Sequence, residues 1–130
     1  MMVSITAILA FLLLGFVEIL RDIWLFDKGR SAIVKLREGA LPGALETASR
    51  ELASNLKAKR TGRGFFGTIR LYSFCRYIHL DGGGTVMLVV VGRKPMHLLC
   101  INVSRGALAT VPAIEGALVD LIDPAWAPPP

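Results

Sequence analysis

Two cysteines and two histidines are spaced in a way that suggests a zinc site. Cys75 and His79 are four positions apart, and His97 and Cys100 are three apart. A structural zinc needs four ligands that converge on one point. Both pairs lie in stretches typical of β-strands, where side chains alternate between faces, so Cys100 should point away from the other three. The sequence therefore predicts buried thiols and strand histidines, with no metal site and no cofactor.

Other chemistry has even less support in this chain. The serines have no histidine and acid at a recognisable spacing, and the Walker pattern is absent. The segment Asp81–Gly84 (DGGG) is followed by a strand, so it is a turn and lacks the helix N-terminus of a phosphate site. We therefore expect no catalytic residue and predict that the protein is not an enzyme.

The chain begins with an uncharged apolar stretch, from Met1 to Val17, and apolar residues continue to Phe26. A helix over residues 3–26 would be about 36 Å long, whereas a bilayer core is about 30 Å thick. A cleaved signal peptide fits poorly, because no Lys or Arg precedes the run and no small-residue cleavage site follows it. A buried helix of a globular protein is the other alternative. The length favours a single transmembrane helix.

Charged residues follow this apolar run at once. Glu18, Arg21 and Asp22 are three and four positions apart, so they share one helical face, and Trp24 is of a type that favours membrane interfaces. We interpret these four residues as a membrane or partner interface. They either reach the lipid headgroups or dock against a neighbouring subunit.

Positive charge is concentrated after the apolar run. Residues 27–76 carry eleven Lys or Arg and four acids, within a chain of net charge +5. Positive flanks stay in the cytoplasm, so the N-terminus is expected outside and the remaining chain inside, with reduced cysteines. The densest group is predicted to contact anionic lipid or an acidic partner; it consists of Lys57, Lys59, Arg60 and Arg63.

The same basic segment is not predicted to bind nucleic acid. The stretch RGFFGTIR at 63–70 has the basic residue, glycines and aromatics of the RNA-recognition octamer. It departs from that pattern at Phe66, where a small residue belongs, and at Arg70, where an aromatic belongs. A basic patch alone is weak evidence, so nucleic acid is not among the expected partners.

Four segments are predicted along the chain. Residues 1–28 form the transmembrane helix with its interfacial end, and 29–41 a short juxtamembrane helix and linker. Residues 42–123 form a cytoplasmic α-β-β-β-α domain, and 124–130 a proline-rich tail. Within the domain, helices are predicted from Pro42 and from Pro112, where apolar residues recur every three or four positions. The intervening strands are expected at 67–80, 85–91 and 96–103.

The turns suggest a register for this three-stranded antiparallel meander. Leu80 is paired with Thr85, and Val91 with Met96. Both faces of the sheet are then mainly apolar, so both need a cover. One amphipathic helix for each face is available, and a partner protein or the bilayer is the alternative cover for one of them. The predicted fold class is therefore α+β and membrane-anchored: one N-terminal transmembrane helix, then a three-stranded meander flanked by two amphipathic helices.

Two functions are consistent with these features. The first is a non-catalytic accessory or assembly subunit of a larger membrane complex, such as a respiratory or photosynthetic assembly, with other subunits or itself as partners. The alternative is a membrane-tethered module that binds anionic lipid or an acidic partner through residues 57–63. Salt separates the two, because charge-mediated binding weakens with ionic strength and apolar docking persists.

Overall fold

The structure, a computed structural model, describes residues 4–40, 43–64, 69, 72, 74–93 and 96–123. In these residues one antiparallel sheet of five strands has the order β1-β5-β4-β3-β2. Its strands are β1 (Arg30–Lys35), β2 (Ala58–Gly62), β3 (Phe74–Leu80), β4 (Thr85–Arg93) and β5 (Met96–Val103). The helices are α1 (Ile5–Phe26), α2 (Gly43–Asn55) and α4 (Val111–Leu118), with short 3-10 helices η1 (Arg105–Thr110) and η2 (Val119–Leu121).

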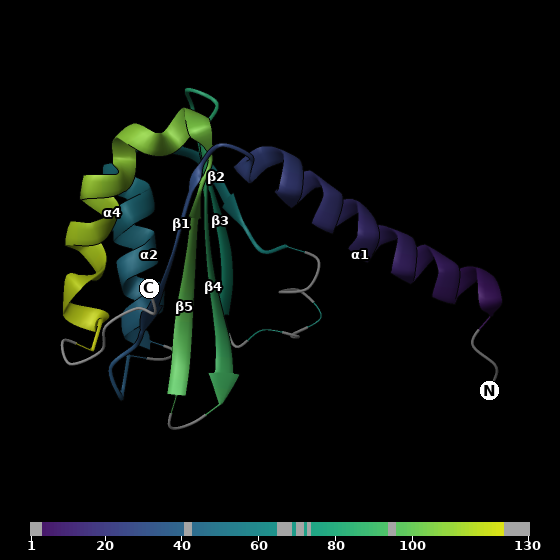
Figure 1. Cartoon of the computed structure of the whole chain (residues 1–130), viewed down its shortest axis with the longest axis horizontal. Coiled ribbons are helices and arrows are strands. Elements are labelled where there is room, and N and C mark those ends of the chain that lie inside the picture. Colours follow the sequence, from purple (N-terminus) through teal and green to yellow (C-terminus); the bar gives the residue numbers. More distant parts are fainter. Residues whose placement is uncertain are drawn as a thin grey trace.

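The helices are distributed unequally over the two faces of the sheet. α2 and α4 lie side by side against one face, whereas α1 leaves the opposite side and projects away from the domain (Figure 1). The predicted cover of one helix on each face is therefore wrong. Both amphipathic helices bury their apolar stripes on the same face.

The main core lies between the sheet and the α2–α4 layer. Strand residues of this face alternate with residues of the other face, as the two-residue period of a strand requires. The side chains at its centre are fully buried, and they are Leu45, Leu52, Ile78, Val86, Leu88, Val90, Leu99, Ile114 and Leu118. Arg76 is a charged residue on this face, and its Nη2 lies 2.6 Å from Glu46 Oε2 on α2, which compensates its partial burial.

The predicted register is wrong by one residue between the first two meander strands, and by two residues between the second and third, where Val91 pairs with Leu98 and not with Met96. His79, and not Leu80, pairs with Thr85, because the turn takes the residues from Leu80 to Gly84. A slip of one residue moves every side chain of a strand to the other face. Cys75 is consequently opposite Val89, and Val89 is opposite Cys100, so both cysteines lie on the face away from α2 and α4.

Two strands at the sheet edges were not predicted. β1 occupies the segment that was predicted to be a short juxtamembrane helix, and it pairs with β5 from Arg30–Val103 to Lys35–Leu98. β2 pairs with β3 and includes residues that were assigned to the end of a helix. The predicted three-stranded meander is thus the centre of a five-stranded sheet. The predicted proline-rich tail at 124–130 lies outside the described residues.

The prediction of a transmembrane helix is also wrong. Among the described residues, none of the helices is both long and apolar enough to cross a membrane. The uncharged part of α1, from Ile5 to Val17, is only about 20 Å long, against about 30 Å for a bilayer core. Beyond it Glu18 is buried against the domain, so α1 packs on the rest of the protein at this position. This finding also contradicts three further predictions: the membrane anchor, the orientation with the N-terminus outside, and the membrane-anchored fold class.

The core assignment predicts how a truncation at its centre changes stability. Leu88→Ala should lower the free energy of unfolding by about 2–5 kcal/mol, because Leu88 is fully buried and its removal leaves a cavity. Val119→Ala is the control, since Val119 is 58% exposed and should change it by no more than about 0.5 kcal/mol. Urea unfolding followed by circular dichroism measures both. Equal effects of the two substitutions would contradict this packing.

Candidate functional site

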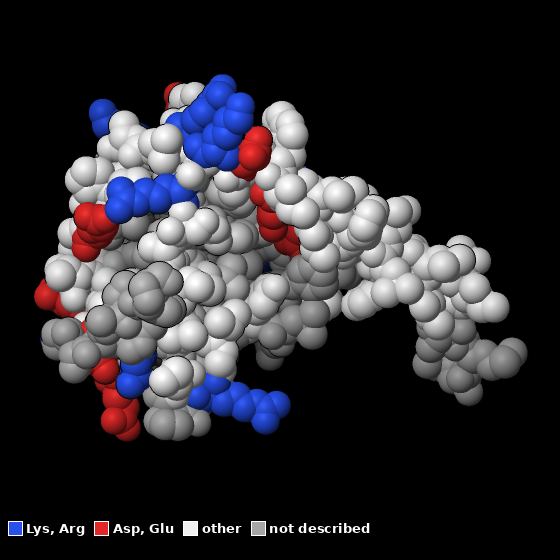
Figure 2. All heavy atoms as spheres, in the orientation of Figure 1, with Lys and Arg blue, Asp and Glu red and all other residues white. Residues whose placement is uncertain are grey.

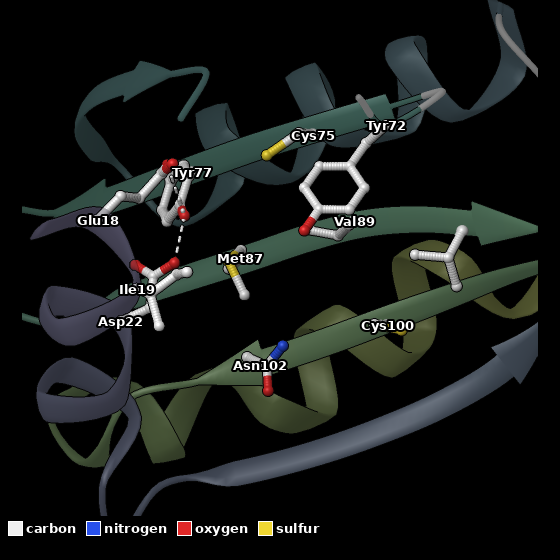
Figure 3. Close-up of a pocket in the computed structure, with 11 residues that line it drawn as sticks. Glu18, Ile19, Asp22, Tyr72, Cys75, Tyr77, Met87, Val89, Cys100 and Asn102 are labelled. Carbon is white, nitrogen blue, oxygen red and sulfur yellow. Dashed lines mark hydrogen bonds between the residues drawn. The ribbon is translucent and has the colours of Figure 1, made fainter. Parts of the chain in front are cut away.

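A cavity of about 250 Å³ lies between α1 and the face of the sheet that α2 and α4 leave open. We call it the α1 cavity. Side chains from α1, β3, β4 and β5 surround it, and Tyr72 closes one side (Figure 3). The lining residues are Glu18, Ile19, Asp22, Tyr72, Cys75, Tyr77, Met87, Val89, Val91, Cys100 and Asn102.

The polar groups of this cavity gather at the end where α1 meets β3. The hydroxyl of Tyr77 donates a hydrogen bond to Asp22 Oδ2 at 2.7 Å, and its oxygen is 3.3 Å from Glu18 Oε1 (Figure 3). Glu18 is only 6% exposed. Arg21 Nη2 lies 3.7 Å from Glu18 Oε1 and 3.4 Å from Asp22 Oδ1, so one guanidinium serves two carboxylates.

A glycine allows this close approach of helix and strand. A Cβ atom at Gly64 would collide with the carboxylate of Glu18 and with the ring of Tyr77. A larger residue at this position would have to displace the carboxylate of Glu18 or the ring of Tyr77.

Burial sets the protonation of the groups around the cavity. It raises the pKa of Tyr77 above its ordinary value of 10.0, and the hydrogen bond to Asp22 raises it further, so the phenol keeps its proton. Burial also raises the pKa of the Cys75 and Cys100 thiols. Both cysteines therefore stay protonated at neutral pH, and a protonated thiol is a poor nucleophile and a poor metal ligand.

The corrected register changes the argument about zinc. Cys75, His79 and Cys100 share the open face, whereas His97 pairs with Gly92 and points to the other face. Cys75 is on β3 and Cys100 is on β5, and β4 lies between these strands. Two strand spacings put the two backbones about 10 Å apart. Within the described ranges no group of three or more His, Cys, Asp or Glu is placed to hold a metal ion.

The four residues predicted as an interface are only partly brought together. Glu18, Arg21 and Asp22 meet at the polar end of the α1 cavity, and their partner there is Tyr77. Trp24 is 77% exposed and is not a lining residue of the cavity. The contribution of Tyr77 was missed, because a tyrosine within a strand carries no local signal of a partner 55 residues away in the sequence.

The basic residues that were predicted to contact anionic lipid or an acidic partner lie at an edge of the sheet. Lys59 and Arg60 are exposed residues of the edge strand β2, while Lys57 precedes this strand with a positive φ of 54° and Arg63 follows it. Charged side chains on an edge strand hinder pairing with another chain. That role accounts for Lys59 and Arg60 without any anionic ligand.

The outer part of α1 exposes large apolar side chains on every side. We call residues 5–17 the apolar arm. In the space-filling view the arm carries no Lys, Arg, Asp or Glu (Figure 2). Nine of its large side chains are between 47% and 75% exposed, and these are Ile5, Ile8, Leu9, Phe11, Leu12, Leu13, Leu14, Phe16 and Val17.

Comparison with known proteins identifies no relative. No protein-family model, no curated protein and no solved structure matches this chain. The function is therefore inferred from the geometry of the described residues.

The hydrogen bond of Tyr77 predicts a pH-dependent stability difference. Tyr77→Phe should lower the free energy of unfolding by about 1–3 kcal/mol at pH 8, because the buried carboxylate of Glu18 and the partly buried one of Asp22 lose their shared donor. A raised pKa means that the folded state holds the phenol proton more tightly. The stabilisation that the protonated phenol gives to the folded state is complete below pH 10 and is lost as the pH rises above it.

Urea unfolding of both proteins between pH 8 and 11 measures this difference. The gap between wild type and Tyr77→Phe should narrow above pH 10. Asp120→Asn removes an exposed acid away from the cavity and should leave the stability unchanged at every pH. A gap that stays constant up to pH 11 would contradict the buried, proton-donating phenol.

Proposed function

We propose that this chain is a non-catalytic assembly subunit that joins a larger protein complex through its apolar arm. The observation that carries the proposal is the exposure of nine large apolar side chains along residues 5–17. Helices of neighbouring subunits enclose the arm in the assembled state.

Enclosure, and not one-sided docking, follows from the distribution of these side chains. Phe11, Leu12, Leu13 and Leu14 are consecutive, and a helix turns about 100° for each residue, so together they face all sides. An amphipathic helix that lies in a single groove shows one apolar stripe and one polar face. The arm has no polar face, and a helix that is apolar all round is usually buried.

The exposed apolar area is also larger than an isolated protein usually shows. Nine side chains at about half exposure, with roughly 150–250 Å² for each when fully exposed, amount to roughly 700–1,100 Å². The largest apolar patch of a typical monomer is about 300–600 Å², whereas one side of a standard protein–protein interface is about 800 Å². The area therefore suits a stable subunit contact.

The base of the arm is held firmly. Glu18 and Asp22 follow the arm directly on α1, and Tyr77 ties both to β3. Ser4 caps the first turn by accepting a hydrogen bond from the backbone N–H of Ala7 at 3.1 Å. A capped helix with a fixed base presents the arm in a defined direction, which lowers the entropic cost of docking.

The chemistry of the described residues supports a non-catalytic role. Both thiols are protonated, and His79 has a pKa lowered by burial and by Arg60 and Arg21, so it is neutral at pH 7. The two carboxylates of the cavity share the hydroxyl of Tyr77 and the guanidinium of Arg21. This is an arrangement that fixes a helix, and it lacks an activated nucleophile with its base.

Size analysis of the tagged chain from its native cells tests this function. In a lysate prepared without detergent, the wild type should elute in a complex much larger than the 14.1 kDa chain. Leu12→Lys/Phe16→Lys places two charges on the arm, where both residues are close to 60% exposed, and should release the chain as a monomer with unchanged Tm.

Val119→Lys is the matched control, because Val119 is equally exposed but lies in η2, away from the arm. It should remain in the complex. A wild-type chain that runs alone as a monomer would overturn the proposal. So would a double variant that stays in the complex, because binding would then not depend on the arm.

A further inference from the structure

A second exposed apolar surface lies on the face of the sheet that α2 and α4 leave open. Ile33 of β1 is 47% exposed and Met96 of β5 is 48% exposed, while Leu98 of β5 is half-buried. Ile33 pairs with Cys100, and Met96 and Leu98 precede Cys100 by even numbers of residues in the same strand, so all three side chains lie on the face of Cys100. We call Ile33, Met96 and Leu98 the open patch.

The open patch differs from a solvated sheet face. An antiparallel sheet with one face on the core normally turns polar side chains to water on the other face. α1 packs on another part of this face, where Tyr77 of β3 bonds to Glu18 and Asp22. Among the described helices none covers the patch, because Ile33 and Met96 keep about half of their surface exposed. The patch is therefore open to a partner.

The apolar arm projects from the same side of the sheet as the open patch (Figure 1). The arm continues the helix away from the domain, and its exposed side chains show that it does not cover the patch of its own chain. A second copy related by a twofold axis would bring its patch to this arm and its arm to the first patch. Two copies thus cover two kinds of exposed apolar surface at once.

A twofold pair also supplies more than one wall for each arm. The side chains of the arm face all directions, so contact on one side alone leaves apolar surface in water. In the pair, the two arms would lie next to each other between the two sheets. Each arm would contact the partner's patch on one side and the partner's arm on another. This is the enclosure by a neighbouring subunit that the proposed function requires.

The dimensions of the arm and of the sheet agree. The arm is about 20 Å long. The four strands from β1 to β3 span about 14 Å at a spacing of about 4.8 Å, so an arm reaches across the open face. Two arms expose roughly 1,400–2,200 Å² of apolar surface, and a standard protein–protein interface buries about 1,600 Å² in total. The area therefore suits a stable dimer.

Charge does not oppose this contact, although each copy has a net charge of +5. The arm contains no charged residue. Lys35, on the same face as Ile33, has its Nζ 3.5 Å from Asp123 Oδ2. Arg93, opposite Met96 at the end of β4, is exposed, so its guanidinium can stay in water. The two copies meet through uncharged side chains.

We propose that the partner of the apolar arm is a second copy of this chain, whose open patch receives the arm in a twofold dimer. This inference rests on the proposed function and names the neighbour that encloses the arm. The dimer contains the contact of arm with patch twice, and the two arms lie side by side between the sheets.

Sedimentation equilibrium of the purified full-length chain, with no other protein present, tests for this dimer. The wild type should have twice the mass of the 14.1 kDa chain. Leu12→Lys/Phe16→Lys on the arm and Ile33→Lys on the patch should each raise the dissociation constant at least tenfold, because each buries a charge in an apolar contact. Val119→Lys is the control, since Val119 is 58% exposed in η2 after α4, and it should dimerise as the wild type does.

Cross-linking between two differently tagged copies tests which surfaces meet. One copy carries Leu9→Cys on the arm, and the other carries Met96→Cys on the patch. A short bismaleimide should join these two copies, and it should not join Leu9→Cys to Val119→Cys. The wild type gives the background of the native thiols, Cys75 and Cys100, whose pKa is raised by burial so that they react slowly.

The proposal is overturned if the purified chain stays monomeric at high micromolar concentration. If that chain still elutes in a large complex from its native cells, the assembly function stands and the partner of the arm is a different protein. A dimer that Ile33→Lys does not weaken, or that gives no cross-link between arm and patch, also overturns the proposal, because the copies would then meet without the open patch.

Discussion

The contact of Tyr77 with Glu18 and Asp22 is the constraint on which the arrangement of this protein depends. A carboxylate that is 6% exposed is costly unless hydrogen bonds and a counter-charge compensate it, and here the phenol and Arg21 do so. This requirement fixes the rotation of α1, because only the face that bears Glu18 and Asp22 can meet β3. It also excludes a side chain at Gly64. The direction of the apolar arm follows from the same contact, since arm and base are one continuous helix (Figure 1).

The sheet uses its two faces differently, and the α1 cavity and the apolar arm both result from this difference. The face under α2 and α4 is closed by nine fully buried side chains and leaves little space for a ligand. The opposite face carries Tyr77, Met87, Val89 and Cys100. Only the C-terminal half of α1 packs against this face. A helix that touches a sheet at one end leaves a wedge between them. The α1 cavity occupies this wedge, and the rest of the helix extends beyond the sheet as the arm.

Sequence patterns predicted the elements that bury a continuous apolar stripe or run. β4, β5, α2 and α4 are found close to their predicted positions, because each presents strong periodicity or a long β-branched run. β1 was predicted to be a helix, because a six-residue segment with three apolar residues is too short to separate the helical from the strand period, although Ile33 and Val34 are β-branched. β2 has one apolar residue, Ala58, followed by polar residues and a glycine, so it gives no strand pattern. The register of the first strand pair failed by one residue because DGGG is compatible with more than one turn length, and only the burial of alternate residues decides between them.

The candidate site shows the same limit at the level of single residues. The three charged positions on α1 were identified as an interface, because charge at the end of an apolar run is unusual in any setting. Their partner was not identified, since Tyr77 is brought to Glu18 only by the packing of α1 on β3.

The difference between a membrane span and the observed helix also rests on these positions. Composition alone treats residues 3–26 as one apolar segment. Once Glu18 and Asp22 bond to a strand, the helix has two parts: a base that belongs to the domain and an arm too short to cross a bilayer. The side chains of this exposed arm face every direction, so under the proposed function a partner has to surround the arm in order to exclude water from it.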